Sequence, residues 1–207
     1  MAKKNVLLLG ATGGIGSNLL NLMQHSDTYT VDGWSSKNLD LNCPEKIFDC
    51  NFSKFDLLIN CAGHNQGSYL GFLKNSWQNQ ISQITVNYIS NLMLLKHYAN
   101  SRQVGKFVWI STSSMDNPRI YHSVYTGTKV ASKFSIDLIA QEATHIDMLE
   151  AKVGLTKTNI RYRNFEGTKT QSEVNETYGN SYVLNALDVA TQIYQAIDKN
   201  FKQVIIL

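Results

Sequence analysis

The sequence of 207 residues has little cysteine and lacks a long apolar run near its start. Its three cysteines, Cys43, Cys50 and Cys61, are odd in number and lack metal-ligand spacing, which argues against structural disulfides and bound metal. The apolar run after the basic first residues spans only Val6 to Leu9, too short for a secretory or membrane-spanning segment. We therefore expect a cytoplasmic protein without a metal site or membrane attachment.

Clustered charge is also missing. The net charge is only +3, and the lysines and arginines are scattered along the chain. This distribution gives no electrostatic surface for nucleic acid or for a membrane, so any bound anion is expected to be small. Without a linker, internal repeat or low-complexity segment, residues 1–207 are expected to form a single domain.

What the sequence does contain is an alternation of short apolar runs and amphipathic stretches. Short apolar runs separated by helical patterns are typical of a parallel sheet with crossover helices, so the expected class is α/β, a doubly wound, Rossmann-like sheet. The predicted strands are Val6 to Leu9, Tyr29 to Trp34, Phe55 to Asn60, Phe107 to Ser111, Leu149 to Val153 and Val204 to Leu207. The predicted helices are Gly14 to Gln24, Ser76 to Ala99, Tyr125 to Thr144 and Leu187 to Lys199.

One long polar segment interrupts this alternation. Residues 161–181 are rich in Asn, Thr and Gly and carry interleaved aromatic residues: Tyr162, Phe165 and Tyr178, with Tyr182 just beyond. Long irregular insertions in compact domains are commonly lids or disordered segments, and the aromatic residues favour a lid over the substrate site.

A glycine-rich turn follows the first predicted strand in the stretch VLLLGATGGIG. A strand, a glycine turn and a helix expose backbone N–H groups and the positive end of the helix dipole at one point, which forms an anion site. Gly10 permits the turn, Gly14 lets a pyrophosphate approach the backbone, and Gly16 lets the helix pack closely on the strand. Because no Gly-Lys-Ser/Thr ending follows, a P-loop NTPase is disfavoured.

Further motifs occur in a recognisable order, and together they resemble the short-chain dehydrogenase/reductase family. They are Gly10-x-x-x-Gly14-x-Gly16, Asn60-Cys61-Ala62-Gly63, Asn87, Tyr125-x-x-x-Lys129 and the segment Gly154 to Thr158. The sequence departs from the family pattern at Leu9 and Val153, and its segment from Asp40 to Asp56 is short for a full crossover helix. It is also shorter than most members of the family.

Tyr125 and Lys129 lie four residues apart, so on a helix their side chains share one face. A free tyrosine titrates near pH 10, and a neighbouring ammonium group would stabilise its phenolate and lower its pKa. Tyr125 is therefore the acid/base candidate, and Lys129 is expected to lower its pKa. The resemblance implies that Lys129 also binds the nicotinamide ribose.

The resemblance also implies a hydroxyl that binds the substrate carbonyl and an asparagine in a proton relay. An ungapped alignment places Thr112 at the hydroxyl position, and a shift of one residue would place Ser113 there. Asn87 matches the relay asparagine, with the alternative that it braces the helix backbone.

The cofactor is expected to be NADP, with NAD as the alternative. Asp32 lies early in the second predicted strand, which leaves Ser35, Ser36 and Lys37 to accept a 2′-phosphate. Asp40 resembles the acid that contacts adenine, although it would also suit a helix cap ahead of Pro44. The expected cofactor-binding residues are Gly10, Thr12, Gly13, Gly14, Ile15, Gly16, Ser35, Ser36, Lys37, Asp40, Asn60, Ala62, Gly63, Lys129, Gly154 and Thr158.

The function expected is an oxidoreductase that transfers hydride between the nicotinamide cofactor and a carbonyl or alcohol substrate, with Tyr125 passing the proton. One alternative is a nucleotide-sugar dehydratase or epimerase with retained cofactor, against which the short C-terminal portion counts. Another is a nicotinamide-sensing binding protein without turnover. Such a protein would not need Tyr125 with a pKa that is adjusted by Lys129. The resemblance also implies a homo-oligomer, a dimer or tetramer, formed through the predicted helices at residues 76–99 and 125–144.

Overall fold

A single parallel sheet of six strands runs through the part of the chain that the computed structural model describes, residues 2–176 and 183–207. The strand order is β2-β1-β3-β4-β5-β6. All six predicted strands are present, and no boundary is displaced by more than three residues. The strands are β1 (Lys4–Leu9), β2 (Tyr29–Trp34), β3 (Leu57–Asn60), β4 (Gly105–Thr112), β5 (Ile146–Val153) and β6 (Gln203–Ile206).

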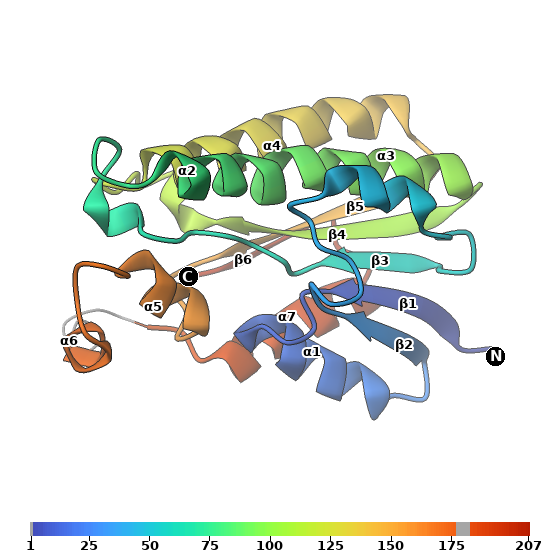
Figure 1. Ribbon diagram of the computed structural model, residues 1–207. Coiled ribbons are helices and arrows are strands. Elements are labelled where there is room, and N and C mark those ends of the chain that lie inside the picture. Colours follow the sequence, from blue (N-terminus) through green and yellow to red (C-terminus); the bar gives the residue numbers. More distant parts are fainter. Residues whose placement is uncertain (1, 177–182) are drawn as a thin grey trace.

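Helices cover both faces of the sheet, which confirms the doubly wound class (Figure 1). One face carries α1 (Gly14–Gln24) and α7 (Ala186–Asp198). The other carries α2 (Trp77–Ile84), α3 (Ser90–Ser101) and α4 (Ser123–Glu142). Parallel sheets need apolar cover on both faces, and the amphipathic pattern of these helices supplies it.

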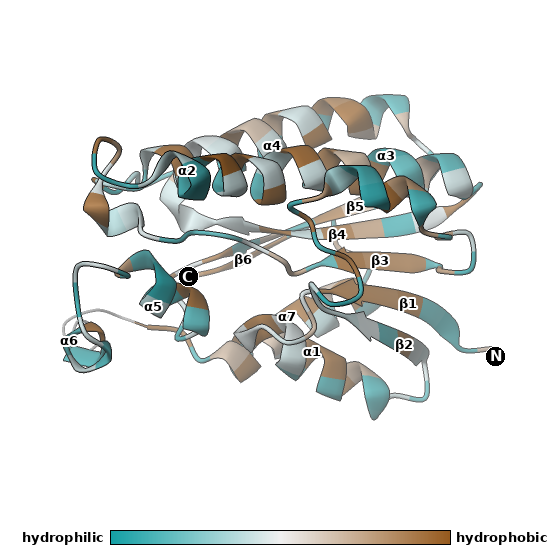
Figure 2. Ribbon diagram, viewed as in Figure 1, coloured by the Kyte–Doolittle hydropathy of each residue, from teal (hydrophilic) through white to brown (hydrophobic). Residues whose placement is uncertain are grey.

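The core is accordingly divided in two by the sheet. Alternate residues of a strand point to opposite faces, so the fully buried Leu8 packs in the cluster that contains residues of α7. Its neighbour Leu7 packs in the cluster that contains residues of α3 and α4. Figure 2 shows β1 and β3 as largely hydrophobic strands, as expected for strands that are buried from both sides.

The connection between β2 and β3 is the crossover that lacks an α-helix among the described residues. It contains the 3₁₀ helix η1 (Pro44–Asp49) and no α-helix. This agrees with the prediction that residues 40–56 are too short for a crossover helix. In the strand order, β2 forms one edge of the sheet.

Two predictions about local structure need correction. The helix predicted from Ser76 to Ala99 is divided by a π-helical turn, η3 (Thr85–Ile89), which separates α2 from α3. The segment 161–181 is more regular than expected, because it includes the end of α5 (Asn159–Asn164) and the whole of α6 (Gln171–Glu176). Its remaining part, from residue 177 onward, and the predicted lid aromatics Tyr178 and Tyr182 lie outside the described residues.

Two short 3₁₀ helices, η2 (Ser68–Leu70) and η4 (Ser113–Met115), complete the described elements. Cys43, Cys50 and Cys61 are free thiols. Within residues 2–176 and 183–207, no helix has the length and apolar character needed to cross a bilayer. The same residues contain no group of His, Cys, Asp and Glu side chains suited to holding a metal ion.

Candidate functional site

A cleft lies at the carboxyl ends of β1 and β3, where the strand order reverses on either side of β1. Ligands of doubly wound sheets bind at such switch points. The cleft has a volume of about 470 Å³, and it is lined by the glycine turn after β1 and also by Tyr125 and Lys129 of α4. The fold therefore brings together two motifs that lie more than 100 residues apart in the sequence.

Two glycines of the turn are required by the close approach of neighbouring backbone. Gly10 has a φ of +76°, and a Cβ on it would lie 2.6 Å from the main-chain nitrogen of Ala62. A Cβ on Gly16 would overlap the carbonyl oxygen of Gly10. Glycine is thus needed at the turn itself and where the first turn of α1 meets it.

Gly14 has a second role that the sequence did not indicate. A Cβ on Gly14 would lie 2.6 Å from the Cγ2 methyl of Thr158, which follows β5. Glycine at this position therefore makes room for the Thr158 side chain. The expected role of Gly14, close approach to a pyrophosphate, stays a prediction.

Most of the predicted cofactor-binding residues line this cleft: Gly10, Thr12, Gly13, Gly14, Ile15, Gly16, Ser35, Ser36, Asp40, Ala62, Gly63, Lys129 and Thr158. Three do not. Lys37 is exposed on the turn after β2, and Gly154 lines a second cavity described below. Asn60 lies behind the cleft, where its side chain donates to Asn91 Oδ1 at 3.0 Å and accepts from the main-chain nitrogen of Ala62 at 3.1 Å.

The end of β2 carries hydroxyls at the cleft and an acid that is engaged elsewhere. Asp32 forms an ion pair with Lys54 at 3.0 Å, and Ser36 is exposed at the rim of the cleft. Asp40 Oδ1 accepts a hydrogen bond from the main-chain nitrogen of Asn42 at 2.9 Å. Asp40 therefore stabilises its own turn and does not cap the helix that begins at Pro44, whose N-cap is Cys43.

Tyr125 is half-buried on the first turns of α4. Burial raises the pKa of its hydroxyl, while a side-chain hydrogen bond with Thr112 and the positive charge of Arg119 lower it. The pKa is raised on balance, whereas the sequence led us to expect a pKa lowered by Lys129. The reason is that desolvation of the phenolate outweighs the favourable interactions that this structure contains.

Lys129 is only 5% exposed. Its Nζ donates a hydrogen bond to the carbonyl oxygen of Ile110 on β4 at 2.9 Å. Burial lowers the pKa of Lys129 to about 8, with an opposite influence from Cys61. The ammonium group is thus held at the floor of the cleft at a cost in desolvation.

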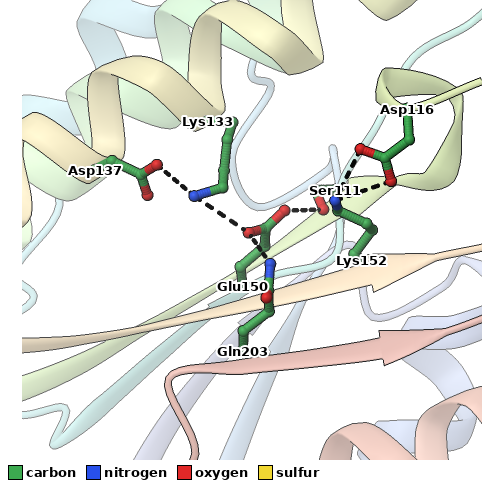
Figure 3. A network of polar contacts seen from close by, with 7 residues as sticks. All are labelled: Ser111, Asp116, Lys133, Asp137, Glu150, Lys152 and Gln203. Atoms are coloured by element: carbon green, nitrogen blue, oxygen red, sulfur yellow. Dashed lines mark hydrogen bonds and ion pairs between the residues drawn. The ribbon is translucent and has the colours of Figure 1, made fainter. Parts of the chain in front are cut away.

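The hydroxyls at the end of β4 have different partners. Ser111 Oγ donates to Glu150 Oε1 at 2.5 Å, and Figure 3 shows this carboxylate on β5 between Ser111, Gln203 of β6 and Lys133 of α4. Thr112 instead interacts with the Tyr125 hydroxyl and lowers its pKa. Ser111 is therefore directed away from Tyr125, and Thr112 is directed toward it.

Thr112 and Ser113 both line the second cavity, so both candidates for the carbonyl-binding hydroxyl lie at its wall. Thr112 Oγ1 also lies 3.0 Å from Ser114 Oγ and accepts from the main-chain nitrogen of Ser114 at 3.2 Å. These bonds fix the Thr112 side chain at the start of η4.

Asn87 lies in the π-helical turn and is 2% exposed. Its Oδ1 accepts from the main-chain nitrogen of His64 at 2.9 Å, and its Nδ2 donates to the carbonyl oxygen of His64 at 2.7 Å. The carbonyl oxygen of Asn87 accepts from Ser132 Oγ at 2.9 Å. Its side chain therefore braces the backbone of His64, which lines the cleft, and not that of its own helix.

The second cavity, of about 110 Å³, adjoins the cleft and shares Tyr125 and Thr158 with it. Arg119, His122 and Arg161 line this cavity. No sequence motif indicates a role for these three residues. Only the position of His122 could have indicated a role at the site. It precedes Tyr125 by three residues and would face the same side of a helix.

The predicted lid contributes a wall to this cavity. Phe165 stacks on Tyr69 with ring centroids 3.8 Å apart, and Tyr162 donates to Asn175 Oδ1 at 2.8 Å. Arg161, at the start of the segment, is held against the Tyr69 and Phe165 rings. Two of the predicted lid aromatics are thus packed or hydrogen-bonded within the described residues.

Comparison with known protein families gives a match over residues 6–195 to one family, described as the NAD dependent epimerase/dehydratase family. No curated protein sequence matches the chain. The family match spans the glycine turn, Tyr125 and Lys129.

Solved structures of short-chain dehydrogenases share the fold over almost the whole chain. A small-chain dehydrogenase in complex with NADPH is 21% identical with a TM-score of 0.83, covering 100% of this chain and 97% of that one. A short-chain dehydrogenase from Sphingobium yanoikuyae in complex with NADPH is 19% identical with a TM-score of 0.76, covering 98% and 87%. The closed form of serine dehydrogenase complexed with NADP⁺ is 19% identical with a TM-score of 0.77, covering 97% and 94%. At these identities the likeness establishes the fold.

Proposed function

The chain belongs to the NAD dependent epimerase/dehydratase family, and on that premise we propose that it is an NADP(H)-dependent oxidoreductase. Its substrate is a carbonyl compound or the corresponding alcohol, and Tyr125 is the acid/base. The observation that carries this proposal is the single cleft lined by the glycine turn, by Tyr125 and by Lys129. An anion site and a proton donor in one cavity are the two parts that nicotinamide-dependent carbonyl reduction requires.

The residues of the cleft fit a dinucleotide. The first turn of α1 presents N–H groups that have no carbonyl partner within the helix, and it contains no acidic side chain. Arg163 lines the same cleft and adds a positive charge. The site therefore offers main-chain donors and a cation to the phosphate groups, and the buried Lys129 to the other end of the ligand.

When bound, NADP(H) would supply or accept the hydride. In the reducing direction, Tyr125 Oη donates its proton to the carbonyl oxygen as the hydride reaches the carbonyl carbon, which gives the alcohol. Thr112 holds the same oxygen with its hydroxyl, since it is the hydroxyl directed toward Tyr125. Lys129 stabilises the phenolate that remains, and Asn87 positions His64 at the cleft wall.

Three points favour NADP over NAD. Ser36 at the rim of the cleft and the neighbouring Lys37 are exposed, and both can accept a 2′-phosphate. The charge of Asp32 is partly neutralised by Lys54. Two of the similar solved structures hold NADPH, and one holds NADP⁺.

The experiment that tests the proposed function is a panel of aldehydes, ketones and oxo acids with NADPH or NADH oxidation followed at the nicotinamide absorbance. We expect turnover with NADPH for at least one class. Tight NADPH binding without turnover on any class would reject the oxidoreductase and favour a nicotinamide-sensing binding protein.

The family description favours a second candidate, a dehydratase or epimerase of nucleotide-linked sugars. Such an enzyme oxidises and re-reduces one substrate and keeps its cofactor. It would be isolated with nicotinamide bound, and it would convert UDP-glucose without net consumption of NADPH. The oxidoreductase is expected to be isolated largely free of cofactor and to leave UDP-glucose unchanged.

We also propose a homo-oligomer formed through α4. Val130, Phe134 and Leu138 recur at four-residue steps on this helix and are 47%, 69% and 47% exposed. An exposed apolar stripe of this kind is typical of an interface between copies. Light scattering of the purified protein tests it, and a monomer at micromolar concentration would reject it.

A further inference from the structure

The second cavity has a distinct electrostatic character. It is lined by two arginines, Arg119 and Arg161, and by His122, and none of the described residues that line it is acidic. A cavity walled by guanidinium groups favours an anionic occupant. Because this cavity also contains Tyr125 and Thr112, the anion would lie beside the proposed reacting groups.

His122 is a buried polar residue without a partner among the described residues. It is 4% exposed, and neither ring nitrogen makes a hydrogen bond. Its ring packs edge-on against Tyr69 at 4.9 Å and against Tyr125 at 6.1 Å between centroids. A buried polar group normally has a hydrogen-bond partner, so these nitrogens indicate that an oxygen of a ligand completes the site.

The arginines already influence the groups around the cavity. Burial, together with the charges of Arg119 and Arg161, lowers the pKa of His122 to about 4. The charge of Arg119 also acts to lower the pKa of the Tyr125 hydroxyl. His122 is therefore neutral at physiological pH and keeps one N–H to donate, while the positive charge comes from the arginines.

Arg161 is held in place by its surroundings. It is 6% exposed, and its guanidinium lies 4.9 Å from the Phe165 ring centroid and 5.7 Å from that of Tyr69. Its Nη1 donates to the Tyr69 hydroxyl at 3.3 Å. An arginine fixed in this way is preorganised to bind an oxyanion, whereas Arg119 is exposed and can adjust to it.

From these observations, and resting on the proposed oxidoreductase function, we infer that the substrate is a small carbonyl compound that carries a carboxylate bound by Arg119, Arg161 and His122. The hydride adds to the carbonyl carbon, and the Tyr125 proton adds to its oxygen. The carboxylate takes no part in the bond changes and returns to solvent with the hydroxy acid. We name a carboxylate because the cavity is small, about 110 Å³, and a phosphate ester is an outcome that the test distinguishes.

The test compares small oxo acids with their neutral methyl esters: pyruvate, acetoacetate and succinic semialdehyde, each paired with its ester. With NADPH, we expect kcat/KM to be higher for at least one acid than for its ester. Arg119→Gln should lower the acid-to-ester ratio by ~10-fold or more, because a charged hydrogen bond is lost. Arg119 is exposed, so the variant should fold.

A matched control removes an equal charge elsewhere. Lys199 is exposed at the end of α7, and α7 leads into β6, so Lys199 lies near the amino ends of the strands, opposite the cavity. Lys199→Gln should leave the acid-to-ester ratio unchanged. An equal fall in both variants would show that only net charge matters and would overturn the inference.

Binding separates this inference from the proposed function. Each acid, its ester and dihydroxyacetone phosphate are titrated by calorimetry into protein saturated with NADP⁺. Acid binding that Arg119→Gln weakens, with no turnover of any pair, would support the carboxylate site and reject the oxidoreductase. Turnover or binding of the esters as strong as that of the acids would overturn the carboxylate site and leave the oxidoreductase intact. Binding of neither member of any pair, or tighter binding of dihydroxyacetone phosphate, would also overturn it.

Discussion

The two ends of the site, the glycine turn and the second cavity, offer different chemical groups to a ligand. At the glycine turn, Gly10 and Gly16 are required by backbone packing, and the groups offered to a ligand are main-chain N–H groups and the helix dipole. At the second cavity, the groups offered are side chains: Thr112, Tyr125, Arg119, His122 and Arg161. In the proposed function, the first end binds a cofactor common to many proteins, and the second selects the substrate.

The glycine turn and the buried Lys129 also differ in their effect on the free energy of folding. The glycine turn is formed without burying a charged group, whereas Lys129 is buried near Tyr125 and has a pKa of about 8. Burying an ammonium group opposes folding. The buried Lys129, which lines the cleft beside Tyr125, is thus expected to reduce stability, and the glycine turn is not.

The largest expected effect comes from Tyr125→Phe, which removes the proton donor and keeps the ring. General acid catalysis contributes typically 10² to 10⁴-fold, about 3 to 5 kcal/mol of barrier, and kcat on an active carbonyl substrate should fall by that order. NADPH affinity and the melting temperature should change little, since they depend on other groups. Steady-state turnover, NADPH titration and thermal melting on one preparation check this. Full activity in the variant would show that Tyr125 is not the acid.

Lys129→Met tests the cost of burying this ammonium group in the cofactor-free protein. Between pH 8 and 10.5 the unfolded wild type binds a proton that the folded protein has lost, so its free energy of unfolding should rise with pH across this range. Below pH 8 the variant should be the more stable, by up to about 3 kcal/mol, and the difference should shrink as the pH rises. Urea unfolding at several pH values measures it. Parallel stability curves from pH 8 to 10.5 would contradict the assignment.

Gly14 and Thr158 test the main-chain end. Gly14→Ala should destabilise the protein through the close contact of its Cβ with the Thr158 methyl, and it should also weaken NADPH binding. Adding Thr158→Ser removes that methyl. The double variant should regain only part of the stability, because the Thr158 Cβ, 3.0 Å from the added Cβ, remains. It should still bind NADPH ~10-fold more weakly, if a pyrophosphate approaches Gly14. Recovery of both properties would mean that Gly14 serves only to accommodate Thr158.

The smallest effect is expected from Ser36→Asp at the rim. A carboxylate there would repel a 2′-phosphate, so the preference for NADPH over NADH should fall by roughly threefold to tenfold. Ser36→Asn introduces a side chain of the same size without charge and should leave the preference close to that of the wild type. The ratio of the two affinities, measured at low salt, gives the answer. An unchanged ratio in the aspartate variant would place the 2′-phosphate elsewhere.

Much of the fold could be predicted from the sequence because local patterns determine it. β2 and α1 have the same bounds as predicted, since an apolar run and a helical period mark them clearly. The π-helical turn at Thr85–Ile89 could not be predicted, because its apolar residues continue the helical period without a break. Hydrophobic periodicity does not distinguish a π turn from an α turn.

The site could be predicted in part for the same reason. The glycine turn and the Tyr125–Lys129 pair are local spacings, so the sequence alone indicates them. The Arg161 side chain reaches the cavity from a segment 36 residues beyond Tyr125, and only the tertiary fold shows that the two share a wall. The net effect of burial on the pKa of Tyr125 likewise depends on neighbours that spacing does not reveal.

In the proposed function, hydride passes within this cleft between NADP(H) and a carbonyl carbon. To test it, the protein is incubated with NADPH that carries deuterium at C4 of the nicotinamide, prepared as each of the two stereoisomers, and with the panel of aldehydes, ketones and oxo acids. The products are then analysed by mass spectrometry. We expect one isomer to yield an alcohol with one deuterium on the carbinol carbon, and Tyr125→Phe to slow its formation by 10² to 10⁴-fold. NADPH binding without any deuterated product, from either isomer and any compound of the panel, would contradict the oxidoreductase.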